Sequence, residues 1–294
     1  MPIPQVRQAG LSQITIISVC YYSSGVLPKM LNSIPEGVPT ILVDNGSDEI
    51  EAVRQMAETH GATLIESQDN IGFGRARNLG AAKATTELLL FLNPDSHLLP
   101  GALDALQEGA DNHPDASAFN PAILDRKGAP RFRRYSVIIP RNETLPRKTA
   151  DSDFELPVLV GAAFLVRREA FEAVGGFDPE IFLYHEDDDL SLRLKAVCGP
   201  LYYVHNAQMR HARGKSSPGS PAIAGLKGWY MGQSRVYVAR KHEVPMAFGR
   251  ALASALLQVL SPAVLFSARK RAKQWAFLRG VWHGRNARPA PFRP

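Results

Sequence analysis

Residues 14–19, with the sequence ITIISV, begin the alternation that decides the fold. This short apolar run is rich in β-branched residues and predicts a buried strand, followed by a helix near residues 27–34. The pattern repeats, with strands predicted at 40–43, 63–65 and 88–92 and helices at 48–60, 75–84 and 101–112. Apolar strands that alternate with helices predict an α/β fold with a mostly parallel central sheet flanked by helices.

The second half of the chain is less regular. Strands are predicted at 116–119 and 158–166, and the segment 126–155 between them is rich in Arg, Lys and Pro, which favours a mobile loop over a site. From residue 221 onward the pattern becomes helical. Asp48, followed three residues later by Glu51, predicts a capping box for the helix that ends near residue 60.

The composition is that of a globular chain with one large core. With 294 residues, 45% of them hydrophobic, the chain is long enough for an α/β domain plus an appendage. Cys20 and Cys198 lie in unlike contexts, so a disulfide framework is not expected and a reducing cytoplasm fits. Residues 1–10 lack the apolar segment of a secretory signal, which also predicts a cytoplasmic location.

The net charge of +6 is concentrated at the C-terminus. No Asp or Glu follows Glu243, whereas nine Lys and Arg residues do, so residues 1–243 alone carry a charge of −3. We therefore expect a main domain at 1–243 and a basic amphipathic helical tail at 244–294. The charge of the main domain excludes nucleic acid as its partner.

Four consecutive carboxylates, Glu186, Asp187, Asp188 and Asp189, stand at the predicted start of a helix. The helix dipole favours acids in a first turn by roughly 0.3–1 kcal/mol each, so one or two of them need no functional explanation. Four crowded carboxylates raise the pKa of at least one, which suits a group that takes a proton or lies beside a metal ion. Apolar segments on both sides of the run argue against the alternative, a solvated and well-capped helix end.

Two of the predicted strands end in an acid, Asp44 after the second and Asp95 after the fourth. Ligands of open α/β sheets bind outside the carboxyl ends of the strands, which makes both acids candidate site residues. The turn Gly72-Phe73-Gly74 lacks the third glycine of a dinucleotide fingerprint and follows the third strand, so we reject NAD binding. It can still approach a diphosphate, with Arg77 among the donors, although an ordinary strand-to-helix turn explains it equally well.

The tripeptide Asn93-Pro94-Asp95 is a candidate cation site, because Mg²⁺ and Mn²⁺ prefer carboxylate, phosphate and water ligands. The same tripeptide is a good β-turn sequence that needs no ligand. His211, in the basic segment 210–217, either completes such a metal site or belongs to an ordinary basic loop.

Taken together and in this order, these motifs resemble those of the inverting family 2 glycosyltransferases, enzymes with the GT-A fold. Within that family they are most similar to the bacterial rhamnosyltransferase-like branch, which builds O-antigen and related cell-surface glycans. The matching motifs span residues 12–242 and are VDNGS at 43–47, NIGFG at 70–74 with NLG at 78–80, LNPD at 92–95, GAAFL at 161–165, GGFD at 175–178, ED at 186–187, and His211 with Gly214 and Ser216.

The resemblance implies how the donor, a nucleotide-diphosphate sugar, is bound. Asp44 is expected to contact the nucleobase, with the strand end at 18–22 lining its pocket. Asp95 is expected to hold the donor diphosphate and, with His211, a Mg²⁺ or Mn²⁺ cofactor. The predicted donor-binding residues are Ser18, Tyr22, Asp44, Asn70, Gly72, Arg77, Asn93 and Asp95.

For the chemical step the resemblance implies that Asp187 is the general base, which deprotonates the acceptor hydroxyl for in-line attack on the anomeric carbon. Glu186 and Asp189 are expected to orient the acceptor or support the base, and Asp188 receives no role. A divalent cation would stabilise the departing nucleoside diphosphate, and a single displacement inverts the anomeric configuration.

Asn93 departs from the family pattern, because many members carry an acid there, and this weakens the expectation of metal dependence. The Asn-Pro-Asp motif recurs in the rhamnosyltransferase-like branch and favours a deoxythymidine-diphosphate (dTDP) sugar, with rhamnose as the sugar, while UDP and GDP stay open. The acceptor is expected to be a glycan or a polyprenyl or other lipid-linked glycan at the inner face of the cytoplasmic membrane. The alternatives are a sugar nucleotidyltransferase, which normally needs a Gly-rich first loop that this chain lacks, and a non-catalytic sugar-nucleotide-binding or membrane scaffold protein.

The tail has two apolar segments. Residues 250–266 are interrupted by Gln258 and Pro262 and are too short and broken to predict a transmembrane helix. Residues 268–283 bring Trp275, Leu278 and Trp282 to one side and basic residues to the other, which is typical of a helix at an anionic membrane surface, at roughly 1 kcal/mol per basic residue. The alternative is a helical hairpin packed on the body or in a homodimer interface.

Overall fold

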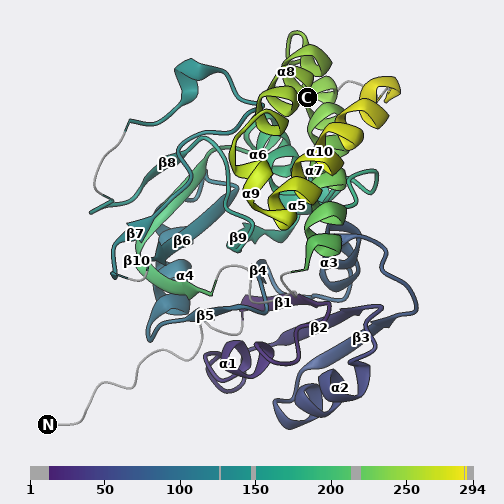
Figure 1. The fold of residues 1–294 in the computed structure, drawn as a ribbon. Coiled ribbons are helices and arrows are strands. Elements are labelled where there is room, and N and C mark those ends of the chain that lie inside the picture. The colour runs from purple at the N-terminus through teal and green to yellow at the C-terminus, as the bar shows by residue number, and fades with distance from the viewer. Residues whose placement is uncertain (1–12, 126, 147–149, 213–219, 288, 290–294) are drawn as a thin grey trace, which may run out of the picture.

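The computed structural model describes residues 13–125, 127–146, 150–212, 220–287 and 289. Figure 1 shows a single sheet with helices against it, and the C-terminal helices, drawn green to yellow, form one group on the side away from the first strands. The motif residues Gly214 and Ser216, most of the basic segment 210–217 and the N-terminal segment 1–10 lie outside the described residues. Within the described chain, no helix is both long enough and apolar enough to cross a membrane.

The first half of the sheet is parallel, with the strand order β3-β2-β1-β4. Its strands are β1 (Ile14–Cys20), β2 (Thr40–Asn45), β3 (Thr63–Ser67) and β4 (Leu88–Leu92). The helices of this half are α1 (Leu27–Leu31), α2 (Ile50–Thr59), α3 (Phe73–Ala81) and α4 (Ala102–Asn112). Because the four strands are parallel, their carboxyl ends lie at one edge of the sheet, and the prediction of a parallel sheet is confirmed here.

Beyond β4 the sheet is mixed. Strand β9 is antiparallel to β4, β6 is antiparallel to β9, β10 is parallel to β6, and β5 is antiparallel to β10. Short strands β7 and β8 add to β6 and β10. The bounds are β5 (Ser96–Leu98), β6 (Ala118–Leu124), β7 (Pro130–Arg131), β8 (Phe154–Leu156), β9 (Ala163–Arg167) and β10 (Leu201–His211). The prediction of a mostly parallel sheet is therefore correct for the first half only. A buried strand has the same apolar sequence pattern whether it is parallel or antiparallel to its neighbours.

Three local predictions need correction. The strand predicted at 158–166 begins only at Ala163. The preceding residues form a loop, because the Asn120 amide bonds the N–H and C=O of Val160, at 2.8 and 3.1 Å, and the Ser191 hydroxyl accepts from the N–H of Leu159 at 2.9 Å. The segment 126–155 is not wholly irregular, since it contains β7, β8 and a 3₁₀ turn at Arg141–Glu143.

The predicted capping box at α2 is also wrong. The N-cap residue is Glu49, and no side chain caps the helix. The Asp48 carboxylate instead accepts from the Tyr22 hydroxyl at 2.9 Å, and Glu51 pairs with Arg54 at 2.6 Å. A tertiary contact therefore takes the side chain that the local pattern had assigned to the helix.

The core has two layers, one on each face of the sheet. Successive strand residues point to opposite faces, so that Ile16 and Leu90 belong to one buried cluster while Ile17 and Phe91 belong to the other. Side chains of α1, α2 and α4 complete the first cluster, and those of α3, α5 (Arg168–Ala173) and α6 (Glu186–Val197) complete the second. Burial on both faces explains why the strands read as continuous apolar runs.

The C-terminal helices are α7 (Pro221–Lys241), α8 (Ala247–Val259), α9 (Ala263–Phe266) and α10 (Ala268–His283). Glycines let α7 and α10 approach closely: a Cβ on Gly228 would lie 2.3 Å from the carbonyl oxygen of Lys273, and one on Gly280 would lie 2.0 Å from that of Trp229. The predicted boundary at 243–244 thus separates two helices, α7 and α10, that pack against each other.

Candidate active site

A cavity of about 1100 Å³ opens at the carboxyl ends of the parallel strands. One end is lined by Tyr21 and Tyr22, which follow β1, and by Asn45, the last residue of β2. The other end is lined by the first turns of α7, which contribute Lys227 and Tyr230. The acids and amides predicted from the sequence meet this cavity between those two ends.

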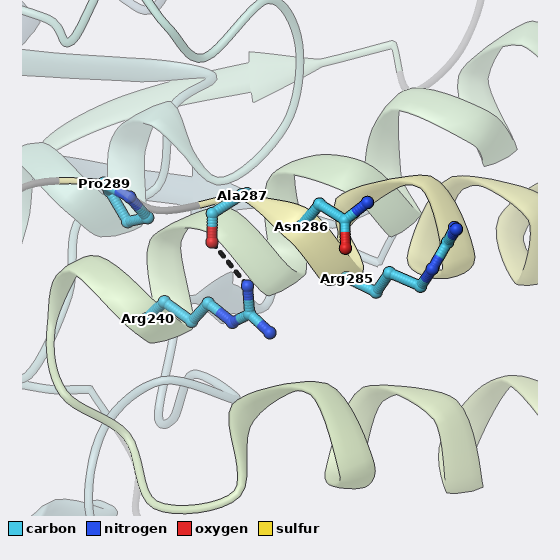
Figure 2. Close-up of a pocket in the computed structure, with 5 residues that line it drawn as sticks. All are labelled: Arg240, Arg285, Asn286, Ala287 and Pro289. Atoms are coloured by element: carbon cyan, nitrogen blue, oxygen red, sulfur yellow. Dashed lines mark hydrogen bonds between the residues drawn. The ribbon is translucent and has the colours of Figure 1, made fainter.

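A second hollow, of about 650 Å³, lies at the end of the tail and is shown in Figure 2. Its lining residues are Arg240, Arg285, Asn286, Ala287 and Pro289, and the Arg240 guanidinium donates to the carbonyl of Ala287. These five residues include no carboxylate and no residue that the sequence assigned to a site. The larger cavity is therefore the candidate active site.

Asp95 and His211, far apart in sequence, meet at this cavity. Strands β5 and β10 pair antiparallel with His211 opposite Ser96, so the residue before β5 lies beside the end of β10. The Nε2 atom of His211 lies 3.1 Å from a carboxylate oxygen of Asp95, and both side chains line the cavity. Among the described residues, no cluster of three or more His, Cys, Asp or Glu side chains of the kind that holds a metal is present. A cation at this pair would therefore take its remaining ligands from substrate and water.

Asn93 also lines the cavity, and Arg77 holds it from behind. An Nη atom of Arg77 donates to the Asn93 side-chain oxygen at 2.9 Å and to the carbonyl of Gly161 at 2.7 Å. The guanidinium is buried 4.2 Å from the centre of the Phe73 ring, and burial lowers the pKa of Arg77 to about 10. Arg77 does not line the cavity itself but supports Asn93, and its expected contact with the diphosphate stays a prediction.

The residues near β1 and β2 that were predicted to bind the donor differ in their position relative to the cavity. Tyr22 and Asn70 line the cavity, whereas Ser18 and Asp44 are buried behind it. Both carboxylate oxygens of Asp44 accept from Ser47, one from its N–H at 3.0 Å and one from its hydroxyl at 2.6 Å. Asp44 therefore shapes the turn after β2, and the nucleobase contact expected of Asp44 and Ser18 stays a prediction.

Asn45, one residue further on, occupies the place that was expected for Asp44. Its side-chain amide donates to the Asn70 oxygen at 3.0 Å and accepts from the N–H of Ile71 at 3.0 Å. Gly72 has a φ of +95°, and a Cβ there would lie 2.9 Å from the carbonyl oxygen of Phe182. Gly72 therefore acts by letting the segment that precedes the acidic run come close, and it does not line the cavity itself.

The acidic run starts α6 and splits into two pairs. Glu186 and Asp187 line the cavity, and Asp188 and Asp189 do not. Asp187 accepts from Arg133 at 3.0 Å and from the N–H of Gly161 at 3.2 Å. These two contacts hold the Asp187 carboxylate at the cavity wall.

Electrostatics distinguishes the four carboxylates further. Burial and the neighbouring Asp187 raise the pKa of Glu186 to about 8. Burial and Asp188 raise the pKa of Asp187, while Arg133 acts in the opposite direction. Burial also acts against ionised Asp188, but His185 and Arg133, each 2.7 Å away, outweigh it and lower its pKa to about 2.

Asp189 is structural. Its side chain is 0% exposed and pairs with Arg193 at 2.7 Å and with Lys241 and His242 at 2.8 Å. Although burial opposes ionisation, the hydrogen bond with His242 and the cations Arg193 and Lys241 hold the pKa of Asp189 well below its usual range. Asp189 therefore connects α6 to the end of α7, which fits the supporting alternative of its predicted role, and that role stays a prediction.

Three groups that line the site escaped the sequence analysis. Arg133 comes from the segment that was predicted to cover the site, but the several Arg residues of that segment gave no sign of which one turns inward. Phe182 stacks on Tyr230 of α7, with ring centres 4.3 Å apart, and both line the cavity. Lys227 lies one turn before Tyr230 on α7, and no local sequence motif marks Lys227 or Tyr230.

Known proteins are similar to this chain in sequence and in fold. The family model described as glycosyl transferase family 2 matches residues 15–175, more than half of the chain. The N-acetylglucosaminyl-diphospho-decaprenol L-rhamnosyltransferase of Mycobacterium tuberculosis is 30% identical over 242 residues, which are 71% of this chain and 79% of that protein. Rhamnosyltransferase WbbL of Escherichia coli is 27% identical over 78% of this chain and 93% of its own length.

Two solved structures share the fold. The mannosyltransferase PcManGT from Pyrobaculum calidifontis, in complex with GDP-Man and Mn²⁺, superposes with a TM-score of 0.57 at 18% identity, over 92% of this chain and 86% of that one. S. aureus TarS 1-349 in complex with UDP gives a TM-score of 0.56 at 14% identity, over 94% and 93% of the two chains. The GT-A prediction is thereby confirmed at the level of the fold.

Proposed function

The chain belongs to glycosyl transferase family 2, and from that premise we propose that it transfers rhamnose from dTDP-rhamnose to a lipid-linked glycan acceptor. It is a glycosyltransferase of cell-surface polysaccharide synthesis. The donor, the acceptor and the residue roles are the proposal. The observation that carries it is the presence of Asp187 and of the Asp95 and His211 pair on the wall of one cavity.

The proposed donor lies along the strand ends. The nucleobase and ribose occupy the end lined by Tyr21, Tyr22 and Asn45, and the diphosphate lies at Asp95. The choice of dTDP-rhamnose is supported by relatives named as rhamnosyltransferases, one of them a dTDP-rhamnosyl transferase of Shigella flexneri. The solved structures with GDP-Man and UDP make GDP and UDP donors the alternatives to be tested.

The Asp95 and His211 pair fits a divalent cation. A carboxylate oxygen and an imidazole nitrogen, 3.1 Å apart at the cavity wall, match the preference of Mn²⁺ and Mg²⁺ for few protein ligands plus phosphate oxygens. We assign these two residues as its ligands. When bound, Mg²⁺ or Mn²⁺ would neutralise charge on the nucleoside diphosphate.

Asp187 is proposed as the base. The acceptor hydroxyl gives its proton to the Asp187 carboxylate while its oxygen bonds to the anomeric carbon, and the bond from that carbon to the diphosphate oxygen breaks with the electron pair leaving on the nucleotide. Attack from the side opposite the nucleotide inverts the anomeric carbon. Arg133 and the N–H of Gly161 hold the carboxylate in place, and its raised pKa makes it a stronger proton acceptor than an ordinary Asp.

The acceptor is proposed to enter at the α7 end of the cavity. The stacked pair of Phe182 and Tyr230 offers an apolar face suited to a sugar ring, and Lys227 offers a cation to an acceptor phosphate. An acceptor with a diphosphate and a polyprenyl chain, as named for the mycobacterial rhamnosyltransferase, combines these features. Such an acceptor places the enzyme at the inner face of the cytoplasmic membrane.

A transfer assay tests the function directly. The purified chain is incubated with dTDP-rhamnose, UDP-sugars or GDP-sugars, with a polyprenyl-diphosphate-linked N-acetylglucosamine, and with Mg²⁺, Mn²⁺ or a chelator. We expect rhamnosyl transfer with inversion, read by mass and by the anomeric coupling of the product. Transfer from a UDP- or GDP-sugar alone would overturn the donor, and no nucleotide release with any acceptor would overturn the function.

A further inference from the structure

Large apolar side chains are exposed where α8 turns into α9. The exposed fractions are 72% for Leu257, 78% for Leu260, 74% for Leu265 and 88% for Phe266. Isolated exposed apolar residues are normal in soluble proteins, but four within ten residues of chain form a patch that water disfavours. They lie at one turn of the helical unit, and this turn has no role in the cavity.

Basic residues follow immediately. Arg269, Lys270, Arg271 and Lys273 occupy the first two turns of α10, where the positive end of the helix dipole disfavours cations. In the described part of the chain none of the four forms an ion pair, and no Asp or Glu follows Glu243 in the sequence. Among the described residues, no carboxylate is therefore paired with this cluster.

The helices run in directions that bring this turn to the cavity. Helices α7 and α10 pack directly against each other and are parallel, since Gly225 lies beside Ala272 and Gly232 beside Phe277. Helix α8, which comes between them in sequence, packs beside them, and Arg235 of α7 donates to Ser254 of α8 at 3.2 Å. The start of α10 is therefore beside the start of α7, which lines the cavity. The cations Arg269 and Lys273 are close enough to reinforce the effect of burial, which lowers the pKa of the cavity residue Lys227.

The packing of α10 buries only part of the side that the sequence predicted to face lipid, since Trp275 is 47% and Trp282 53% exposed. Leu278 packs against the buried cluster of Phe277, Val281 and α8 residues, and the Trp282 ring lies 6.1 Å from that of Phe248. The alternative of a helix packed on the body is the one that the structure supports for α10. The most exposed apolar side chains lie in the turn before α10.

We propose that Leu257, Leu260, Leu265 and Phe266, with Arg269, Lys270 and Lys273, form a docking surface for an anionic lipid bilayer. This inference rests on the proposed function, because it presents the α7 end of the cavity to a membrane that carries the lipid-linked acceptor. The apolar side chains enter the interface while the cations meet the lipid phosphates. A second copy of the chain is the less suitable occupant, since a two-fold interface would bring the same cations together.

Vesicle co-sedimentation of the full chain tests the proposal. The vesicles are phosphatidylcholine alone or phosphatidylcholine mixed with phosphatidylglycerol. The wild type is expected to bind the mixed vesicles, and Arg269→Gln/Lys270→Gln/Lys273→Gln to bind them about a hundredfold more weakly. The matched control Lys29→Gln/Lys83→Gln/Lys127→Gln removes the same charge from exposed positions elsewhere and is expected to bind within about threefold of wild type.

The apolar part is tested by Leu260→Ser/Leu265→Ser/Phe266→Ser, with Val197→Ser at the exposed end of α6 as control. The triple variant is expected to lose at least about tenfold in binding and the control to keep it. Failure of the wild type to bind mixed vesicles, or equal binding of both triple variants and wild type, would overturn the proposal. Loss of a concentration-dependent dimer in the apolar variant, without loss of vesicle binding, would assign the surface to a second copy instead.

A nucleotide thermal shift on the same proteins separates this inference from the proposed function. The variants change no cavity residue, so each is expected to show the wild-type shift with dTDP, which also verifies folding. A chain that binds vesicles as expected but no nucleoside diphosphate would keep the docking surface and lose the proposed function. A chain that binds the nucleotide but no vesicle would lose the docking surface and keep the proposed function.

Discussion

Glu186 and Asp187, on the cavity side of the α6 start, contrast with Asp188 and Asp189 on its inner side. All four follow one another in sequence and share the same helix dipole. Burial and neighbouring carboxylates raise the pKa values of the first two. Partners close in sequence (His185, Arg193) and partners from other segments (Arg133, Lys241, His242) lower those of the last two. The contrast shows that the acidic run supplies the carboxylates. Their partners, several of them distant in sequence, determine which carboxylate can accept a proton.

The largest expected effect is on catalysis by Asp187. Asp187→Asn should lower kcat about a thousandfold, because an amide cannot accept the acceptor proton. Steady-state kinetics with dTDP-rhamnose measures it, and the thermal shift with dTDP should stay at the wild-type value. Asp104→Asn, at an exposed position of α4, is the matched control; a kcat of Asp187→Asn close to that control would transfer the base to another group.

The next effect is on stability and comes from the inner side. Asp189→Asn should lower the free energy of unfolding by about 3 kcal/mol, because it leaves the buried Arg193 without its counter-charge. Urea denaturation measures the change. Glu172→Gln, which removes an exposed pair with Arg168, should cost less than about 1 kcal/mol, and equal losses in the two variants would contradict the structural role of Asp189.

A pH series tests whether the pKa shifts of Glu186 and Asp188 change the stability with pH in opposite directions. The pKa of Glu186 is raised from 4.5 to about 8, so the wild type loses stability as the pH rises through this window, and Glu186→Gln should be more stable than wild type by about 2 kcal/mol above pH 8. Asp188 has a lowered pKa, so Asp188→Asn should be less stable at neutral pH, by an amount that disappears as the pH falls towards 2. Thermal unfolding across pH measures both, and a common sign would break the contrast.

The smallest effect concerns Arg133, which contacts both sides of the run. Arg133→Gln removes a cation that lowers the pKa of Asp187, so the acid limb of the pH profile of kcat/KM should move up by about one unit. Arg54→Gln, at an exposed pair remote from the cavity, should leave the limb in place. An unchanged limb in Arg133→Gln would mean that Arg133 only supports the loop.

Much of the first half of the fold follows from local patterns. The strand at 88–92 was predicted with the bounds that the structure shows, and those at 14–19 and 40–43 are each within two residues of the observed ends. Buried parallel strands are short and apolar, and helices separate them, so the pattern is strong. The later strands were harder because side chains from elsewhere, such as Asn120, replace the ladder hydrogen bonds of residues that look like strand.

The site was predicted in part for the same reason. Asp95, Asn93 and Asp187 follow strands or start a helix at the binding edge, and the structure brings them to the cavity. Asp44 and Arg77 come from equally good motifs and lie behind the wall, where Ser47 and Asn93 take their polar atoms. A motif gives the order of residues along the chain, and it does not say which side of a turn faces the ligand.

By itself, the sequence determined the alternation of strands and helices, the edge of the sheet where ligands bind, the placement of the basic charge in the tail and the family. The tertiary structure alone decided which acids line the cavity, which cations neutralise the others, that α10 packs on α7, and that apolar side chains are exposed at the turn before α10. The physical reason is range. Periodicity and helix-end charge act within a few residues, whereas burial, pKa and exposure depend on segments such as Arg133 and Lys241, which lie some fifty residues from the acids that they contact.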